Sequence, residues 1–383
     1  MHKRRGIVNR GNSCFLNSTL QCLAVSPFIL EFIDNYSNND NEIIRIINKY
    51  ELGKFNSNEI NVKCESILQE PTTLKEDVEI LEYISKNSSI LYIYISFKEI
   101  IKNLNNGAND PVDNTLFVSI NKEISAYYGF DYLFNGNQND PHEFMVYLLD
   151  KLHDAKKTKT IINEPENIDT LDNYTKLYYL NYKKRYENDY SLFVKNFYYY
   201  ILNCVKCNKC KNTTHDAAPS DILCVSIPNN ISNDINIYDC LNDMFKVEDV
   251  QYNCEKCNNH ENNIIQKKIM VTPKTLVIKI KRYYTKGKIL VKNNSFIKYP
   301  LILDMMPYII CENSQKYVLY GIINHTGMLD FGHYYSYIRK YNRKDKIFSD
   351  QWYCCNDSNV SEITTEQVFN SQNAYILFYH FVG

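Results

Sequence analysis

One cysteine of the chain lies where a loop turns into a helix. Small and polar residues precede Cys14, and apolar residues recur at helical spacing over residues 15–24 until Ser26-Pro27 stops the run. The pattern predicts that Cys14 lies in the first helical turn, where free backbone amides and the helix dipole stabilise a thiolate. Because a lone cysteine in a helix is more often a small buried hydrophobic residue, a nucleophile here requires a base elsewhere in the chain.

A histidine near the carboxyl end of the chain is the candidate base. Gly332 precedes His333, and the alternating residues 333–339 predict a strand that begins at His333. Further along, a second short strand ends in Asn356 and Asp357, two side chains that can orient an imidazole ring. The chain therefore holds a candidate nucleophile, base and orienting group in the order Cys, His, Asn.

Two Cys-x-x-Cys pairs form a candidate metal site. The pairs are Cys207 with Cys210 and Cys254 with Cys257. Four thiolates in this pattern suit a tetrahedral zinc ion, although residues 211–253 separate the pairs more widely than in short zinc modules. Cys204 leaves another first pair open, because Cys204 and Cys207 are also a Cys-x-x-Cys. Unligated buried cysteines are one other interpretation, and a redox pair is another, which the lack of a thioredoxin-like βαβ pattern around either pair disfavours.

Several residues in the middle of the chain together predict the start of a helix. Asp140 suits the N-cap, Pro141 suits the first helical position, and Glu143 completes a capping box. An apolar stripe follows within residues 144–152. Capping alone explains these residues, and contact with a substrate is compatible with it.

The elements that position these residues change along the chain. Residues 28–135 are predicted to be mostly helical, with periodic apolar segments at 42–52, 74–86 and 90–104, the last of which also fits the start of a strand. Strand patterns dominate later, at 222–228, 275–283, 318–325 and 375–379. Helices in the first half and strands in the second predict an α+β protein.

Composition limits the classes of function. The chain has 383 residues, long enough for two or three subdomains, and its 43 Lys+Arg against 44 Asp+Glu give a net charge of −1. We therefore expect no nucleic-acid or membrane partner. No apolar run has transmembrane length, the basic start lacks the apolar core of a signal peptide, and the unevenly spaced cysteines favour reduced thiols inside a cell.

Two long motifs resemble a known family, the ubiquitin-specific proteases, which are papain-like cysteine proteases. Residues 6–21 read GIVNRGNSCFLNSTLQ and are similar to the family's cysteine box, GLxNLGNTCYMNSxLQ. Residues 332–339 read GHYYSYIR and residues 352–357 read WYCCND, which resemble the family's histidine box, GHYxAYxR and WxxFND. Motifs of this length and order are specific, whereas a lone Cys or His is not.

The resemblance assigns roles to residues at matching positions. It implies a catalytic triad of Cys14, His333 and Asn356, with an oxyanion donor from the side chain of Asn9 and assistance from Asp357. It also matches residues 138–144 to the family's QxDAxEF motif, which implies that three polar side chains face the tail of ubiquitin: Gln138, Asp140 and Glu143. Gly332 is a fourth expected substrate contact, at the end of the glycine-flanked loop 324–331 that we expect to be mobile.

The resemblance also implies a domain layout and a choice of metal ligands. It implies one catalytic domain, 6–383, made of a helical thumb (6–155), a polar connection with a lead-in helix (156–199), zinc-ribbon fingers (200–275) and a β-sheet palm (276–383). The lead-in helix is expected over 177–197, with Tyr199 in place of the family's usual glycine. The spacing to Thr214 and to the following strand favours Cys207 and Cys210 over Cys204 as ligands.

The resemblance finally implies an activity. The expected reaction is hydrolysis of the peptide or isopeptide bond after the last glycine of ubiquitin, through an acyl-enzyme, with a structural zinc ion. Ubiquitin and ubiquitinated proteins are the expected partners of a monomeric enzyme in the cytoplasm or nucleus. Two alternatives remain open: a ubiquitin-binding scaffold with little turnover, and an isopeptidase for another ubiquitin-like modifier.

Overall fold

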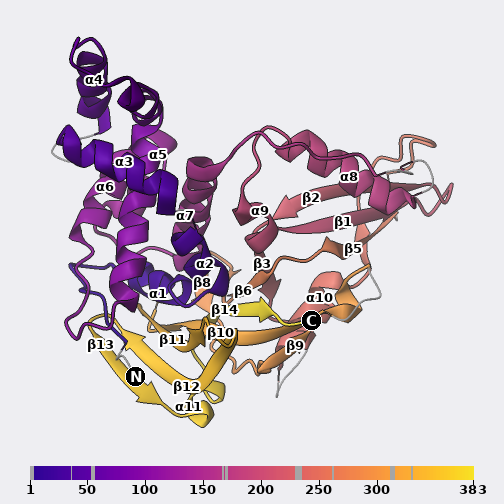
Figure 1. Ribbon diagram of the computed structural model, residues 1–383. Helices are drawn as coiled ribbons and strands as arrows, with labels where there is room; N and C mark the ends of the chain where they lie inside the picture. Colours follow the sequence, from indigo (N-terminus) through magenta and orange to yellow (C-terminus); the bar gives the residue numbers. More distant parts are fainter. Residues whose placement is uncertain are drawn as a thin grey trace. The chain divides into compact units, whose positions relative to one another are not determined.

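The chain divides into two compact units, which are described separately. The computed structural model describes residues 4–35, 37–52, 57–165, 168, 171–228, 235–260, 263–310, 315–328 and 331–383. The first unit comprises Met1–Lys156, His333–Ser349 and Tyr353–Glu362, and the second comprises Lys157–Gly332, Asp350–Trp352 and Ile363–Gly383. Helices dominate the early part of the chain and strands the later part (Figure 1), which confirms the predicted α+β class.

The first unit combines seven described α-helices with three strands. The helices are α1 (Cys14–Leu23), α2 (Pro27–Asn35), α3 (Ser37–Lys49), α4 (Ser57–Leu68), α5 (Lys75–Asn105), α6 (Thr115–Ser125) and α7 (Pro141–Lys156). The strands are β11 (His333–Asn342), β12 (Ile347–Asn356) and β13 (Asn359–Ile363), which pair in the order β13-β12-β11. The segment from residue 90 is helical throughout, because it belongs to the 31-residue helix α5.

Helix α1 lies in the core of the first unit. All ten of its residues are buried, and it packs against β11 and α7. The ring of Phe15 meets the ring of Phe144 on α7 edge to face, with centroids 5.9 Å apart. Phe144 is fully buried and also contacts the rings of Phe117 and Phe134. Burial of α1 on every side holds its first residue, Cys14, in a fixed position.

No single helix among the described residues is long and apolar enough to cross a membrane. The pair formed by α1 and Pro27–Asp34 of α2 has the required length and composition only when the two are taken together, with a bend of 77° between them.

The segment that leads to α1 pairs with two other parts of the first unit. The Ile7 amide donates a hydrogen bond of 2.8 Å to the Asp357 carbonyl, and the Val112 amide donates one of 2.9 Å to the Gly6 carbonyl. A Cβ atom at Gly6 would lie 2.3 Å from the Ser358 carbonyl oxygen, so only glycine permits this approach. Tertiary contacts thus fix the start of the path from residue 6 to Cys14.

The second unit holds four described α-helices and eleven strands. The helices are α8 (Asn173–Tyr186), α9 (Leu192–Phe197), α10 (Ile237–Phe245) and α11 (Thr365–Phe369). The strands are β1 (Tyr199–Lys206), β2 (Thr213–Ser220), β3 (Ile222–Ser226), β4 (Glu248–Val250), β5 (Asn263–Val271), β6 (Thr275–Lys281), β7 (Tyr283–Lys286), β8 (Ile289–Lys292), β9 (Ile302–Asp304), β10 (Lys316–Thr326) and β14 (Ala374–Phe381).

These strands form two main sheets. One sheet is antiparallel with the order β2-β1-β5-β4, and β1 pairs along its whole length with β2. The other has the order β10-β14-β6-β3, in which β3 and β6 run parallel with Ile222 opposite Val277. Strand β9 pairs with β10, and β7 and β8 form a hairpin. Four of the five β3 residues and six of the seven β6 residues are buried or half-buried, as is typical of parallel strands, although β3 lies at the edge of the sheet.

The structure corrects the predicted helix over 177–197. Helix α8 ends at Tyr186 and α9 begins at Leu192, capped by Ser191. Between them the Tyr190 backbone exchanges two hydrogen bonds, of 2.8 and 3.0 Å, with the backbone of Thr158. This pairing needs an extended backbone and therefore interrupts the helix. Residues 166–167 and 169–170 of the predicted polar connection lie outside the described residues.

Candidate active site and metal site

Cys14 is the first residue of α1, as the sequence predicts. Ser13 is the N-cap residue, and the Asn17 amide donates the first helical hydrogen bond, 2.9 Å, to the Ser13 carbonyl. The backbone amide of Cys14 lies in the first turn, where no intrahelical acceptor is available to it. Cys14 is 3% exposed. The sulfur is thus held at a helix start with the backbone amides of the first turn beside it.

The loop before Cys14 is organised by Asn9. The Asn9 Oδ1 atom accepts hydrogen bonds from the Gly11 amide (2.9 Å), the Ser13 amide (3.3 Å) and the Ser13 hydroxyl (3.1 Å). Gly11 and Asn12 have φ values of 109° and 50°, which are favourable for glycine and tolerated by asparagine. The Asn12 side chain also donates a 2.9 Å bond to the Gly136 carbonyl. Asn9 therefore fixes the turn that delivers Cys14 to the helix.

His333 and Asn356 meet at the ends of two strands. His333 is the first residue of β11, and Asn356 is the last residue of β12. The His333 Nε2 atom lies 2.7 Å from the Asn356 Oδ1 atom. Since an amide oxygen only accepts, Nε2 is the donor, and Nδ1 is the nitrogen that remains for Cys14.

The electrostatic setting of His333 favours its protonated form. Its pKa is raised from 6.5 to about 9, chiefly by a hydrogen bond with Cys14. Desolvation opposes this increase, whereas the Asn356 bond and the nearby charges of Cys14 and Asp357 add to it. A protonated imidazole beside a cysteine sulfur stabilises the negatively charged thiolate. The arrangement can therefore support nucleophilic attack by Cys14.

Asp357 contacts the Cys14 helix and the preceding loop. Its Oδ1 atom accepts a 2.8 Å hydrogen bond from Asn17 Nδ2, and its Oδ2 atom accepts one of 2.9 Å from Asn9 Nδ2. Asp357 has a φ of 49°, a left-handed conformation that turns the chain directly after Asn356. The carboxylate thus joins β12 to two positions around Cys14.

Sequence reasoning did not single out Asn17, although it lies inside the quoted cysteine box. Asn17 is 2% exposed, and its Oδ1 atom accepts a 2.8 Å hydrogen bond from Asn114 Nδ2. Asn114 is 1% exposed and precedes helix α6. A fully buried amide needs partners for its donors and acceptors. Its place one turn after Cys14, inside the quoted cysteine box, was the signal that could have identified it.

The three expected substrate-tail residues lie together at the start of α7. Gln138 and Asp140 are half-buried and directly precede the helix, and Glu143 is exposed in its first turn. Asp140 Oδ1 accepts a 2.8 Å hydrogen bond from the His142 amide, so Asp140 caps the helix. Glu143 faces the Tyr132 hydroxyl, and burial together with this contact raises the pKa of Tyr132.

Gly332, in the second unit, occupies a position with no room for a side chain. A Cβ atom there would lie 2.0 Å from His325 Nε2 and 2.6 Å from the Met328 carbonyl oxygen. His325 is 1% exposed, and its Nδ1 atom lies 3.3 Å from the Tyr283 hydroxyl. The glycine before His333 is therefore required by close packing. Residues 329–330 of the expected mobile loop lie outside the described residues.

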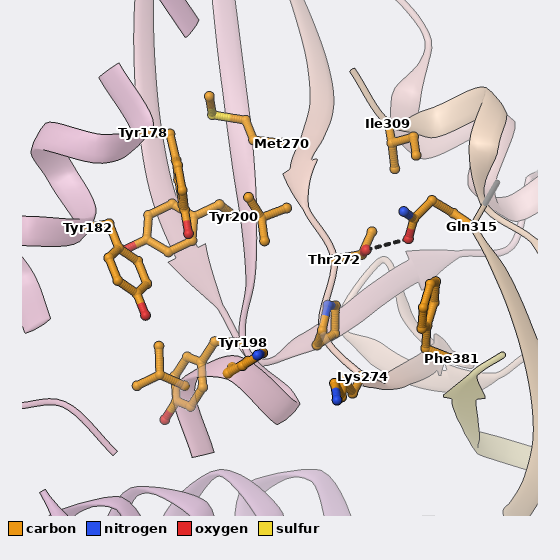
Figure 2. A pocket seen from close by; sticks show the side chains of 14 residues that line it. Tyr178, Tyr182, Tyr198, Tyr200, Met270, Thr272, Lys274, Ile309, Gln315 and Phe381 are labelled. Atoms are coloured by element: carbon orange, nitrogen blue, oxygen red, sulfur yellow. Dashed lines mark hydrogen bonds between the residues drawn. The ribbon is translucent and has the colours of Figure 1, made fainter. Parts of the chain in front are cut away.

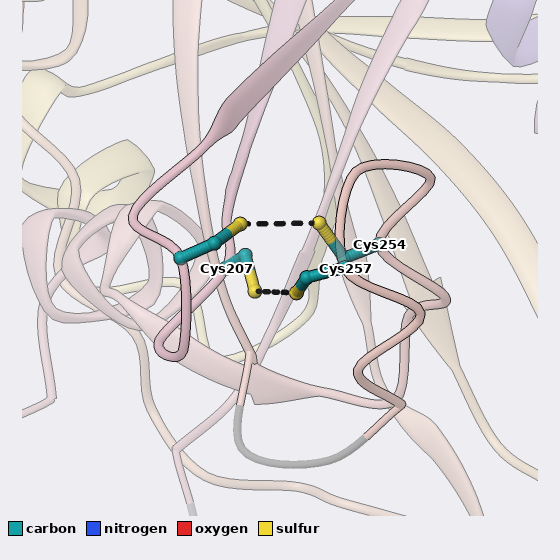
Figure 3. Close-up of side chains that lie close together, drawn as sticks. Cys207, Cys254 and Cys257 are labelled. Atoms are coloured by element: carbon teal, nitrogen blue, oxygen red, sulfur yellow. Dashed lines mark hydrogen bonds between the residues drawn. The ribbon is translucent and has the colours of Figure 1, made fainter.

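The second unit brings four cysteines together, and they are the four that were expected from the sequence to be metal ligands. The sulfur atoms of Cys207, Cys210, Cys254 and Cys257 all lie within 4.8 Å of one another (Figure 3). Cys207 Sγ is 3.6 Å from Cys257 Sγ, and Cys210 Sγ is 3.6 Å from Cys254 Sγ. Zinc–sulfur bonds of about 2.3 Å in a tetrahedron place sulfurs about 3.8 Å apart, so the group could hold a metal ion. Cys204 lies on β1, outside this group.

The two cysteine pairs have the same backbone turn. The Cys207 carbonyl accepts a 2.9 Å bond from the Lys211 amide, and the Cys254 carbonyl accepts one of 2.7 Å from the Asn258 amide. Lys211 and Asn258 each follow the second cysteine of a pair, with φ values of 61° and 51°. Backbone amides of the turn also point to sulfur, and the Cys210 amide lowers the pKa of Cys207. Such turns expose donors that stabilise thiolates.

Comparison with known proteins identifies one family across the chain. The family model for ubiquitin carboxyl-terminal hydrolases matches residues 5–379. A probable ubiquitin carboxyl-terminal hydrolase of Acanthamoeba polyphaga mimivirus is 26% identical, over 99% of this chain and 90% of the relative. Ubiquitin carboxyl-terminal hydrolase 5 of Saccharomyces cerevisiae is 27% identical, over 98% of this chain but only 44% of the relative. The chain thus spans less than half of the yeast relative.

Solved structures share the fold. The SAGA DUB module of Ubp8, Sgf11, Sus1 and Sgf73 bound to monoubiquitin matches with a TM-score of 0.68 and 21% identity, over 100% of this chain and 71% of that chain. The same module bound to ubiquitin aldehyde matches with a TM-score of 0.65 over the same shares. The family model covers nearly the whole sequence and the relatives carry the same name, so this chain belongs to the ubiquitin carboxyl-terminal hydrolase family of cysteine deubiquitinases.

Proposed function

We propose that this chain is a deubiquitinating thiol protease that cleaves the peptide or isopeptide bond after the carboxyl-terminal glycine of ubiquitin. The observation that carries the proposal is the bond of 2.7 Å between His333 and Asn356, next to a cysteine at a helix start. The hydrogen bond between Cys14 and His333, which raises the histidine pKa to about 9, supports the same roles. Cys14 is the nucleophile, His333 the proton carrier and Asn356 the residue that orients the imidazole.

The reaction proceeds in two stages. The Cys14 thiolate attacks the carbonyl carbon of the last glycine, and protonated His333 gives its proton to the leaving amine as the C–N bond breaks. This stage leaves a thioester between Cys14 and ubiquitin. His333 then takes a proton from water, the resulting hydroxide attacks the thioester, and ubiquitin leaves with a free carboxylate while the thiol is restored.

The developing oxyanion needs donors near Cys14. We assign this role to the Cys14 backbone amide and to the side-chain amide of Asn9. The three hydrogen bonds to Asn9 Oδ1 fix which end of the amide carries the donors, and one Nδ2 hydrogen is directed to Asp357. The second Nδ2 hydrogen is the proposed oxyanion donor. One such donor is worth about 2.7–4 kcal/mol in proteases.

We assign binding of the ubiquitin tail to the start of α7 and to the glycine before His333. Gln138, Asp140 and Glu143 offer acceptors for the basic tail that the family resemblance implies, and the role of Gly332 is carried over from that resemblance alone. Solved structures of the Ubp8 module bound to monoubiquitin and to ubiquitin aldehyde support ubiquitin as the substrate. Ubiquitinated proteins would then be the wider substrate class, acted on by a monomer.

We infer that the four-cysteine group binds zinc and that the ion is structural. Four sulfur ligands fill a tetrahedron and leave no position for a catalytic water. The ion would join the turn after β1 to the turn before β5, within the proposed fingers (200–275). The thumb (6–155), connection (156–199) and palm (276–383) complete the proposed layout. We further propose that the cysteines are reduced and that the enzyme acts inside a cell, because their uneven spacing does not suit a disulfide framework.

One experiment separates this function from its alternatives. The purified chain is incubated with ubiquitin carrying a carboxyl-terminal electrophile, and in parallel with the same probes of other ubiquitin-like modifiers. Labelling of Cys14 by the ubiquitin probe, with release of free ubiquitin from a fluorogenic substrate, is the expected result. Labelling only by another modifier changes the substrate class, and ubiquitin binding without labelling or turnover identifies a scaffold.

A further inference from the structure

The second unit contains a pocket of about 610 Å³ that the proposed hydrolysis does not use. It lies where α8 and α9 meet the start of β1 and the end of β5 (Figure 2). Its volume is in the range of about 300–1,000 Å³ that is typical of small-molecule sites. None of its lining residues belongs to the candidate active site or to the four-cysteine group.

Tyrosine rings form one wall of the pocket. Tyr178 and Tyr182 come from α8 and Tyr200 from β1 (Figure 2). The Tyr178 ring meets the Tyr200 ring edge to face, with centroids 5.0 Å apart, and lies 5.4 Å from the Tyr182 ring. Tyr178 and Tyr182 are only half-buried, so part of each ring remains accessible to a ligand. This wall offers ring faces and edges against which a planar ligand can pack.

The third ring of the wall is fixed by the core behind it. Tyr200 is 2% exposed, and its ring packs against the rings of Tyr178 and Tyr186.

The polar groups around the pocket are mainly donors. Lys195 and Lys274 line it with exposed ammonium-bearing side chains, and no carboxylate is among its lining residues. Gln315 Oε1 accepts a 2.7 Å hydrogen bond from the Thr272 hydroxyl, which leaves the Gln315 side-chain NH2 group as its donor toward a ligand (Figure 2). Two cations and an amide donor beside aromatic rings select for a negative charge and against a cation.

We propose that this pocket binds a small aromatic anion, such as an aromatic carboxylate or sulfonate. The ring of the ligand would pack against Tyr178, Tyr182 and Tyr200, and its anionic group would meet Lys195, Lys274 and the Gln315 amide. The proposed binding site does not depend on the proposed hydrolysis, so binding measurements alone can test it.

Fluorescence of 8-anilino-1-naphthalenesulfonate, an aromatic anion that brightens in apolar sites, tests the proposal on the full chain. We expect saturable binding with one site per chain. The double variant K195E/K274E should bind the dye at least about tenfold more weakly, because it reverses both charges at the pocket. Both side chains are exposed, so the folded state should survive the change, which circular dichroism and the melting temperature check.

Three controls make the result decisive. K281E changes an exposed lysine of β6 that does not line the pocket and should bind the dye like the wild type. The uncharged dye N-phenyl-1-naphthylamine should bind wild type and K195E/K274E alike, and Gln315→Leu should weaken only the anionic dye. Equal dye binding by the wild type and K195E/K274E, or equal weakening by K281E, would overturn the assignment.

Discussion

Asn17, one helical turn after Cys14 on α1, donates a 2.8 Å hydrogen bond to the carboxylate of Asp357. The same carboxylate accepts from Asn9, which organises the loop before Cys14. Asp357 therefore joins the helix and the loop that place the cysteine, while its neighbour Asn356 holds the imidazole. Asn356 and Asp357, which are adjacent at the end of β12, thus have separate tasks.

The separation of tasks predicts different phenotypes for the two residues. Asp357→Ala removes two hydrogen bonds and leaves the buried Asn17 amide with only its longer bonds to the Ile7 and Val8 carbonyls, so it should lower the free energy of unfolding by about 1–3 kcal/mol and also lower turnover. Asn356→Ala should lower kcat by about 10- to 100-fold with little change in stability or ubiquitin binding. Steady-state kinetics and thermal unfolding of both variants measure these effects. A larger kcat loss in Asp357→Ala with unchanged stability would reassign the orienting role to Asp357.

Cys14 should be the residue that a ubiquitin electrophile labels. Cys14→Ala removes the nucleophile and His333→Ala removes the proton carrier, so both should lose hydrolysis almost completely. Cys22 is a matched control, because it lies on the same helix and is also buried. Cys22→Ala should keep activity and lose at most about 1 kcal/mol of stability. Mass spectrometry of the labelled peptide identifies the site, and labelling that persists in Cys14→Ala would contradict the assignment.

The raised pKa of His333 predicts a loss of activity at alkaline pH. The leaving amine needs the His333 proton, so kcat/KM should fall as pH rises through about 9. The hydrogen bonds of Cys14 and Asn356 both raise this pKa, and removal of either should lower it. The alkaline limb of Asn356→Ala should therefore lie at lower pH than that of the wild type. An alkaline limb that does not move would show that the Asn356 bond does not tune His333.

The same shift affects stability in a defined pH window. Because protonated His333 is stabilised in the folded chain, its contribution is fully present below the ordinary pKa of 6.5 and disappears as pH rises through about 9. In Cys14→Ala, which lacks the largest cause of the shift, nuclear magnetic resonance titration of His333 should give a pKa closer to 6.5.

One zinc ion per chain is expected at the four-cysteine group. Cys207→Ser, Cys210→Ser, Cys254→Ser or Cys257→Ser should each reduce the bound zinc, which elemental analysis measures. Loss of the ion should destabilise the sheet that contains β1 and β5, and raise KM for ubiquitin substrates more than it lowers kcat. Cys14 should still react with a small thiol reagent.

Cys204→Ser is the matched control for the zinc ligands. Cys204 is half-buried on β1 and lies outside the sulfur group. The variant should keep its zinc. Release of zinc from Cys204→Ser but not from Cys210→Ser would move the site to the other Cys-x-x-Cys.

Local signals in the sequence were sufficient for several features. The helix start at Cys14 follows from an apolar run of helical period after a polar loop, and the cap of α7 follows from Asp140 and Pro141. The strand that begins at His333 follows from alternation after a glycine. Each of these features depends on residues that are close neighbours in the sequence, so the sequence alone is sufficient to predict it.

Tertiary structure decided the features that depend on distant partners. The interruption between α8 and α9 comes from backbone pairing of Tyr190 with Thr158, which no helical periodicity reveals. The commitment of residues 90–101 to helix comes from burial along α5, where short apolar runs fit either structure. The hydrogen bonds of Asp357 join positions 348 and 340 residues apart in the chain. The sequence motifs therefore determined which residues are available for thiol chemistry and metal binding. The tertiary structure decided the separate roles of Asn356 and Asp357, because a side chain forms hydrogen bonds with the groups that lie near it in space.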